Sequence, residues 1–279
     1  MNVKTTRTPE TGSQRTLSKP SPYKLIGYFL IAGLALAAIG GPDLIGKDAA
    51  KQTLSNTLQP PSIAHPLGTN HLGRDMAARL LSGAQLSLSL AFLSVITAGL
   101  PGVILGAVAA WFGGWTDRVL GALADAILAL PGLLLVLMLA AIAPGSWWAL
   151  YVGISFTLWV EYFRYTRQRA RVVLAAPSVE ASQMLGLGPW LLVRRHLIPE
   201  IGPGILTIAA FGAATAVTAV AALGFVSVGI RPPTAEWGGM MTELLPYWRE
   251  APFLILQPVA CLVITVLALN LSVGGMRRP

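Results

Sequence analysis

Residues 177–199 read PSVEASQMLGLGPWLLVRRHLIP, a polar-edged stretch between two long apolar segments. Gly186 and Gly188 tolerate the left-handed backbone conformation that ends a helix, and Pro189 suits the first position of the helix that follows. The stretch therefore predicts a short helix, a turn and a second short helix.

The first of these helices has its own start signal. Ser178 is expected to cap it through the side-chain hydroxyl, and Glu180 then lies in the first turn, where the helix dipole favours a negative charge. The stretch mixes residues too apolar for a free loop with residues too polar for a bilayer. The apolar ones are Val179, Met184, Leu185, Trp190 and Leu191, and the polar ones are Arg194, Arg195 and His196. Such an element lies at a membrane surface or in the groove of a partner protein.

The composition of the whole chain is that of a membrane protein. Hydrophobic residues make up 54% and charged residues 11%, whereas about a quarter of the residues of a soluble domain are charged. Charges are absent from residues 80–116, 126–160, 201–230 and 251–276. Because a span needs about 20 apolar residues, these ranges hold five helices, the second range being broken at Pro144. Residues 25–42 supply a sixth, so we expect an all-α polytopic membrane protein with six transmembrane helices.

The basic residues indicate how these helices are oriented. If the amino terminus is cytoplasmic, 14 of the 20 lysines and arginines lie in inside segments, as the rule for cytoplasmic loops requires. An even number of spans then places both termini in the cytoplasm, together with the 177–199 loop between the fourth and fifth helices. The net charge of +8 does not indicate nucleic acid as a partner, because no basic patch is interleaved with stacking aromatic residues.

The chain divides into four segments on this interpretation. Residues 1–22 form a disordered cytoplasmic tail, 23–84 the first helix with an external amphipathic segment, 85–273 a core of five helices, and 274–279 a second tail. The single cysteine, Cys261, lies in an apolar run, so a disulfide framework is excluded.

A phosphate-loop pattern near the first helix is a coincidence on this interpretation. Gly41, Gly46 and Lys47 have the required spacing, but Asp48 stands where a serine or threonine should bind magnesium. The preceding segment is not a strand, and the pattern falls on the external side. We therefore expect no bound cofactor, with ATP and magnesium held by another chain.

Residues 65–88 read HPLGTNHLGRDMAARLLSGAQLSL and lead into the second helix, expected at about residues 85–110. Asp75 can cap a short amphipathic helix that lies on the membrane, with Arg74 and Arg79 at the surface. Gly68 and Gly73 permit turns.

His65 and His71 raise the question of a metal site, since imidazole suits nickel. The two histidines lack a third ligand at suitable spacing, so structural hydrogen bonding is favoured over metal contact.

Four motifs resemble a known family, the permeases of ATP-binding cassette (ABC) importers. The spacing of Glu180, Ala181, Gly186, Ile198 and Pro199 resembles the cytoplasmic EAA motif of these permeases, with Ser182 in place of the second alanine. The stretch 65–88, the sequence FGGWTDR at 112–118 and the sequence GIRPPTAEWGGMM at 229–241 resemble the dipeptide, oligopeptide and nickel group. Asn70 and Gln85 depart from the group's pattern, and the short tail lacks its aspartates.

The resemblance implies a transport subunit of the prokaryotic inner membrane rather than an enzyme. Its partners would be a second homologous permease, two ATP-binding subunits, an external solute-binding protein and membrane lipid. The EAA segment would dock on an ATP-binding subunit. The assembled importer would then move short peptides, nickel or metal chelates by alternating access. The implied docking residues are Glu180, Ala181, Ser182, Met184, Leu185, Gly186, Arg195, His196 and Pro199.

Pathway or gate candidates lie on other elements, and they are Asp125, Thr215, Thr218, Glu236 and Trp237. Pairing of Asp125 with Arg118 or an arginine of the EAA side is favoured over solute contact, because a carboxylate within a span is costly unless it is paired. Glu161 and Arg164 are one turn apart and can pair.

The fifth helix, at about residues 205–228, is rich in small residues that permit close packing or line a pore. Glu236 and Trp237 either meet the solute-binding protein, form a gate, or belong to an ordered proline-rich turn. A different class, an ion-coupled secondary transporter or channel, is the alternative function. Such carriers place ionisable groups near the membrane midplane, where the expected spans lack them.

Overall fold

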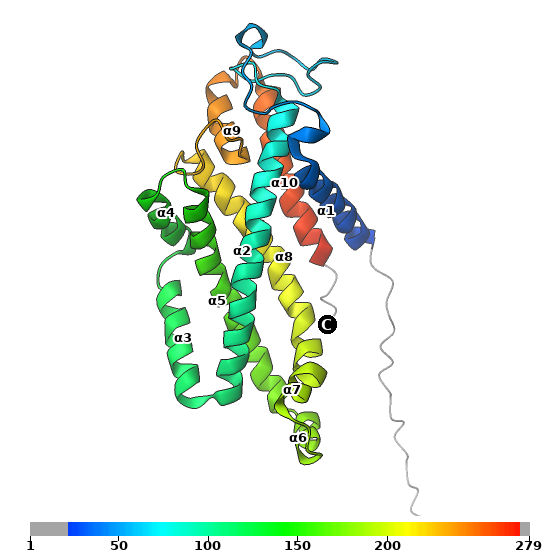
Figure 1. Cartoon of the computed structure of the whole chain (residues 1–279), viewed down its shortest axis with the longest axis vertical. Coiled ribbons are helices and arrows are strands. Elements are labelled where there is room, and N and C mark those ends of the chain that lie inside the picture. The colour runs from blue at the N-terminus through cyan, green and yellow to red at the C-terminus, as the bar shows by residue number, and fades with distance from the viewer. Residues whose placement is uncertain (1–21, 274–279) are drawn as a thin grey trace, which may run out of the picture.

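The computed structural model describes residues 22–273, and over these residues the chain is a bundle of long helices (Figure 1). The long helices are α1 (Pro22–Gly40), α2 (Met76–Phe112), α3 (Gly114–Leu128), α4 (Gly132–Ile142), α5 (Trp147–Leu174), α8 (Ile198–Phe225) and α10 (Pro252–Val273). The short elements are η1 (Gly41–Leu44), η2 (Leu54–Asn56), α6 (Pro177–Met184), α7 (Pro189–Leu192), the turn Val193–Leu197 (η3), α9 (Trp237–Leu244) and η4 (Leu245–Tyr247). The all-α prediction is confirmed over this range.

Four segments are long and apolar enough to cross a membrane, namely α1, α2, α10 and the continuous stretch Pro189–Phe225. The pair α3 and α4 qualifies as a fifth span with a bend. Helix α5, with 28 residues, is long enough to cross a membrane. Its second half carries a glutamate and several arginines, which lower its hydropathy, so it is not among the candidate spans. Length and composition therefore give four or five spans, against the six expected.

The third expected span is broken rather than continuous. Helices α3 and α4 meet at an angle of 75°, and Pro131 is the N-cap of α4 with ψ at 126°, outside the helical range. A proline also disfavours the helical conformation of the residue before it. The break at Leu130 and Pro131 follows from these two constraints.

The second expected helix begins earlier than Gln85, and the separate helix lying on the membrane does not exist. Asp75 caps α2 itself, accepting the backbone N–H of Ala78 at 3.0 Å. The helix then continues for 37 residues, about 55 Å at 1.5 Å per residue. Residues 76–84 contain no proline, and Gly83 packs against the indole of Trp237, so nothing ends the helix there.

Helices α2 and α5 form the centre of the bundle (Figure 1). A Cβ on Gly102 would lie 2.5 Å from the carbonyl oxygen of Trp159, and one on Gly106 would lie 2.7 Å from that of Phe163. Glycines four residues apart allow two helix backbones to approach closely in a membrane. The close approach of α2 and α5 therefore depends on these glycines.

The remaining long helices, α1, α8 and α10, were predicted from the sequence, but their ends differ from the predicted positions. The ends of helices α1 and α10 lie within three residues of the apolar ranges 25–42 and 251–276. Helix α8 begins before residue 205, because it accommodates Pro199 in its first turn and runs on through Pro203.

Apart from the break between α3 and α4, most chain segments between helices lie at two opposite ends of the bundle (Figure 1). One end carries η1, η2 and α9, and the other carries α6 and α7. The start of α1 and the end of α10 both point toward the end that carries α6. The expected tails, 1–22 and 274–279, lie outside the described residues except for Pro22, which begins α1.

Candidate functional site

The stretch 177–199, which we call the EAA hairpin, folds as two helical segments joined by a turn. Its first helix, α6, begins at Pro177, two residues earlier than a cap at Ser178 implies, and its N-cap Ala176 makes no side-chain cap. The predicted cap by Ser178 is therefore wrong, because proline, with its fixed φ, already occupies the first helical position. Glu180 lies in the first turn as predicted.

The turn of the hairpin depends on one glycine rather than two. Gly186 has a φ of +81°, and its N–H donates to the carbonyl oxygen of Gln183 at 2.9 Å. This left-handed residue ends α6 as expected. Gly188, in contrast, has a φ of −68° and is the N-cap of α7, with Pro189 in the first position.

The second helix of the hairpin is not a separate element. Helix α7 passes through a five-residue π turn, Val193–Leu197, directly into α8. Such turns occur inside continuous helices and are frequent at functional sites. A displacement of the hairpin therefore reaches α8 without an intervening flexible loop.

A hydrogen bond joins the two sides of the hairpin. Ser182 Oγ and His196 Nε2 lie 3.0 Å apart, and the Ser182 hydroxyl donates to the carbonyl oxygen of Ser178 at 2.8 Å. Since a hydroxyl has a single proton, both hydrogen bonds form together in the tautomer that carries a proton on His196 Nε2. The hairpin is thereby held closed by two of the predicted docking residues.

The outer surface of the hairpin exposes large apolar side chains. The side chains of Met184 and Leu185 are about four-fifths exposed, and those of Trp190 and Leu191 are also exposed. The inner side is packed, since Val179, Leu192 and Leu197 are buried. Of the predicted docking residues, Ser182 and His196 are half-buried, and Glu180, Ala181, Met184, Leu185, Gly186, Arg195 and Pro199 are exposed. A contiguous apolar surface with a polar margin marks an interaction site.

Ion pairs brace the helices next to the hairpin. Arg164 pairs with Asp125 at 2.5 Å, so Asp125 is paired as predicted, although neither Arg118 nor an arginine of the EAA side is the partner. The pairing of Glu161 with Arg164 that their spacing allows is absent from the described residues, because Arg164 reaches across to α3 instead.

Asp117 is a second anchoring carboxylate, which the sequence did not single out. Arg167 approaches it with two nitrogens, at 2.5 and 2.7 Å, and Arg171 also contacts it. A separate pair joins Arg169 to Glu200 at 2.5 Å. The arginines at the end of α5 are thus held by carboxylates of α3 and α8.

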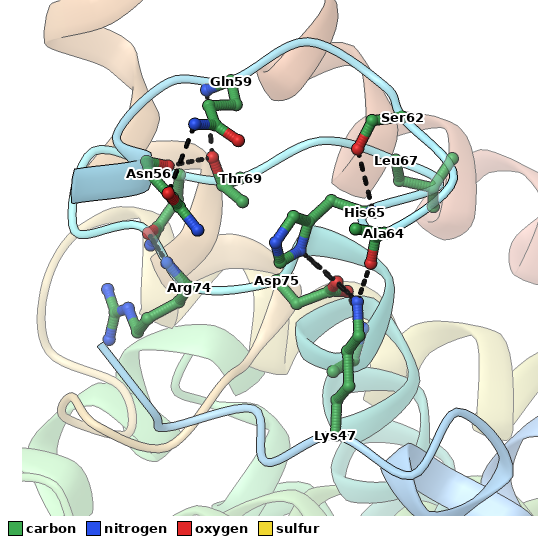
Figure 2. Close-up of polar contacts among 12 residues, drawn as sticks. Lys47, Asn56, Gln59, Ser62, Ala64, His65, Leu67, Thr69, Arg74 and Asp75 are labelled. Carbon is green, nitrogen blue, oxygen red and sulfur yellow. Dashed lines mark hydrogen bonds and ion pairs between the residues drawn. The ribbon is translucent and has the colours of Figure 1, made fainter. Parts of the chain in front are cut away.

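At the opposite end, Asp75 collects several donors before α2 (Figure 2). Lys47 Nζ lies 2.7 Å and His65 Nδ1 lies 2.8 Å from Asp75 Oδ2, and Lys47 also donates to the carbonyl oxygen of Ala64. Burial raises the pKa of Asp75, but the hydrogen bonds from Lys47, the Ala78 N–H and His65 outweigh burial and leave its pKa below the ordinary value. The lysine of the phosphate-loop pattern therefore serves this cluster, and His65 is hydrogen-bonded as predicted.

The predicted surface positions of Arg74 and Arg79 are wrong. Both side chains are 1% exposed and pair with Glu243, at 2.7 and 2.9 Å. Because Glu243 belongs to α9, the segment before α2 folds inward to reach it. His71 lies beside this group and stacks on Tyr247 with the ring centroids 5.0 Å apart, so it has a packing role rather than the hydrogen bond expected.

Glu236 and Trp237 are part of an ordered turn. Their side chains are 2% and 1% exposed, so neither is presented to an external protein in this conformation. Glu236 accepts the N–H groups of Gly238 and Gly239 at 2.8 and 2.9 Å, capping α9. The Trp237 indole N–H donates to the carbonyl oxygen of Leu80 at 3.1 Å. A role of these residues as a gate stays a prediction.

The remaining pathway candidates fall in one place. Thr215 and Thr218 of α8 line a cavity of about 590 Å³ among α4, α5, α8 and α10. Asp125, Glu236 and Trp237 lie outside its lining. Within residues 22–273, no three or more His, Cys, Asp or Glu side chains are grouped so as to hold a metal.

The helical bundle, with the EAA hairpin at one end, and the comparisons with known proteins together define a class of protein, the membrane-spanning permease subunit of an ABC importer. Residues 102–278 match the model of the family described as "Binding-protein-dependent transport system inner membrane component". The chain belongs to this family.

Relatives of known name agree with this assignment. The chain is 30% identical to the dipeptide transport system permease protein DppC of Alkalihalophilus pseudofirmus, over 93% of this chain and 85% of the relative. It is also 30% identical to the oligopeptide transport system permease protein OppC of Bacillus subtilis, over 91% and 83%. The glutathione transport system permease protein GsiD of Pectobacterium atrosepticum is 30% identical over 78% and 72%.

A solved structure shows the same fold. The inward-facing MetNI methionine ABC transporter contains a chain that superposes with a TM-score of 0.55 and 21% identity, covering 70% of this chain and 93% of that chain. The family and the named relatives show that the protein is a multi-pass component of the cytoplasmic membrane and a transport subunit rather than an enzyme. ATP hydrolysis belongs to its ATP-binding partner subunits, and the family name implies a binding protein. A secondary transporter or channel is not favoured.

Proposed function

We propose that this chain is a permease subunit of an importer of short peptides. The three relatives are named for the transport of dipeptides, oligopeptides and glutathione, and each of these solutes is a short peptide. Nickel or a metal chelate is a less supported solute, because none of these names refers to a metal.

The proposed topology has six spans, with α5 and the bent pair α3 and α4 each counted as one. Helix α5 packs along the whole centre of the bundle against α2, which supports its inclusion despite its charges. Both termini and the EAA hairpin then lie in the cytoplasm, and the hairpin connects the fourth and fifth spans.

The observation that carries the proposal is the exposed apolar surface of the EAA hairpin. Met184, Leu185 and Trp190 stand on a short closed element at the end of the bundle, and they need a partner groove to be shielded from water. We assign this groove to an ATP-binding subunit. The second homologous permease and two ATP-binding subunits complete the importer, with lipid around the spans.

The mechanism is alternating access driven from the hairpin. Closure of the ATP-binding subunits moves α6, and the π turn Val193–Leu197 passes this movement to α8, which lines the cavity described above. Opening toward the external side admits the solute from its binding protein, and ATP hydrolysis returns the bundle to the inward-facing state.

Substitutions in the hairpin test this function. Glu180→Lys reverses a charge in the first turn of α6, and Gly186→Asp places a side chain at a positive φ. Both variants should insert into the membrane in normal amounts but lose the copurifying ATP-binding subunit and the uptake of a radiolabelled dipeptide. Glu250→Lys, at an exposed position of the opposite end, is the matched control and should retain both. Normal uptake by the two hairpin variants would overturn the proposal.

A further inference from the structure

The cavity among α4, α5, α8 and α10 contains a carboxylate that the transport cycle described above does not use. Glu161 of α5 is the one charged residue among the described residues that line this cavity of about 590 Å³. The other polar residues of the lining are Thr157, Thr215, Thr218 and Asn270. The rest of the lining is apolar.

The polar lining presents mainly hydrogen-bond acceptors. Thr218 donates its hydroxyl proton to the carbonyl four residues earlier in its own helix at 2.8 Å, and Thr157 donates to the carbonyl three residues earlier at 2.9 Å. The amide nitrogen of Asn270 likewise donates to a carbonyl of its own helix at 2.8 Å. Lone pairs of the two hydroxyls and the amide oxygen of Asn270 are left to accept.

Glu161 has no counter-ion within the described residues. Arg164 follows it by one turn on the same face of α5, but Asp125 holds that guanidinium at 2.5 Å. No hydrogen bond or ion pair within residues 22–273 involves the Glu161 carboxylate. The Glu161 side chain is exposed where it lines this cavity, and ionisable groups that face a cavity in a membrane bundle mark the paths of ions and substrates.

We propose that Glu161, with Thr218 and Asn270, binds a positively charged primary ammonium group of the solute on its way through the bundle. The free amino terminus of a short peptide is such a group, so the inference rests on the proposed function. An ammonium has three N–H donors, and the acceptors of this lining can receive them. A bare divalent metal is a poorer fit, because it prefers several charged or imidazole ligands and the lining supplies one carboxylate.

A labelling experiment measures the charge preference of the cavity directly. Thr218→Cys is introduced in a Cys261→Ser background, and the assembled importer is reconstituted in liposomes without ATP. The cysteine is then modified with two methanethiosulfonates of similar size, one carrying a trimethylammonium group and the other a sulfonate. We expect the cationic reagent to react faster with Thr218→Cys.

Variants at the carboxylate decide the assignment. Glu161→Gln should lower the ratio of cationic to anionic rates by roughly tenfold, whereas Glu161→Asp, which keeps the charge, should largely preserve the ratio. Glu200→Gln removes a carboxylate of α8 outside the lining and should leave the ratio unchanged. Equal ratios of cationic to anionic labelling rates in importers with Glu161 and with Glu161→Gln would overturn the inference. A Thr218→Cys side chain that neither reagent modifies would overturn it too.

Uptake of L-alanyl-L-alanine provides a second readout. At a subsaturating concentration, Glu161→Gln should reduce the rate severalfold and Glu161→Asp should restore most of it; unchanged uptake in Glu161→Gln contradicts the site. The labelling ratio is measured without ATP and without coupling through the hairpin. If the hairpin variants fail to block uptake while the ratio still changes, the docking function fails and the ammonium site stands.

Discussion

Arg74 Nη2 lies 2.7 Å from Glu243 Oε2 and joins the segment before α2 to α9 across 169 positions of the sequence. Arg79 reaches the same oxygen at 2.9 Å, so two buried guanidinium groups share one carboxylate. The Nε atoms of both arginines and one Nη of Arg79 have no hydrogen-bond partner. Glu243 is therefore the charge that compensates both arginines at this end of the bundle.

Glu243→Gln should destabilise the permease by about 3 to 5 kcal/mol, the usual cost of removing one partner from a buried ion pair. The measurement is thermal unfolding of the detergent-solubilised importer. Glu250→Gln is the matched control, because Glu250 is exposed, and a surface change of this kind is worth about 0.5 kcal/mol or less. Indistinguishable unfolding midpoints for the two variants would show that Glu243 does not carry this role.

The end of the bundle that holds Arg74, Arg79 and Glu243 should lose stability as the pH falls below about 6.5, the ordinary pKa of a histidine such as His71. Burial lowers the pKa of His71; Glu243 opposes this shift, and Arg74 and Arg79 reinforce it. In this range the unfolded state gains a proton on His71 that the folded state resists, so lowering the pH favours unfolding.

The check is the unfolding midpoint of the importer measured between pH 7.5 and 5. His71→Phe keeps an aromatic ring against Tyr247 and should reduce the pH dependence. Tyr247→Phe keeps the stacking and leaves His71 in place, so it should retain the wild-type slope. A wild-type slope in His71→Phe would assign the pH dependence to other groups.

Gly186→Ala should weaken the docking of the EAA hairpin while Gly188→Ala should not. A Cβ at either position meets no atom within 4 Å, but only Gly186 has a positive φ. An alanine in that conformation costs about 1 to 2 kcal/mol, which corresponds to a roughly 5- to 30-fold lower affinity for the ATP-binding subunit. Binding of the purified subunit to permease in nanodiscs gives both affinities, and equal losses would place the effect outside the turn conformation.

Gly102→Ala should separate α2 from α5. Its Cβ would lie 2.5 Å from the carbonyl oxygen of Trp159 and 2.7 Å from Cβ of Tyr162, and such overpacking costs about 1 to 3 kcal/mol. Gly33→Ala in α1 is the control, because its Cβ meets nothing within 4 Å. The yield and unfolding midpoint of each variant are compared, and a Gly102→Ala protein as stable as wild type would contradict the close contact.

Local features of the chain were predictable because they depend on neighbouring residues. Apolar runs of sufficient length predicted helices α1, α8 and α10. A glycine at position 186 predicted the left-handed backbone conformation that ends α6. A helix cap by Asp75 was also predicted, since a cap involves residues a few positions apart, but the capped helix is α2 rather than the separate short helix expected. The relatives at 30% identity confirm the family that the spaced motifs indicated.

Contacts between distant segments could not be derived from the sequence. Local pattern placed Arg74 and Arg79 at a surface, because a charged residue is expected in water unless a partner is known, and Glu243 lies in a different part of the chain. Asp125 was expected to pair, but its partner Arg164 depends on how α3 lies against α5. The cavity with Glu161 exists only where α4, α5, α8 and α10 meet.

The sequence by itself determined that the chain is a helical membrane protein with a helical hairpin between two apolar segments, because hydropathy and turn chemistry act over short distances. The permease family followed from the resemblance of its spaced motifs. Tertiary structure alone decided which charges are paired. An ion pair forms only when folding brings two side chains to hydrogen-bond distance, and the spacing of residues along the chain does not contain that distance.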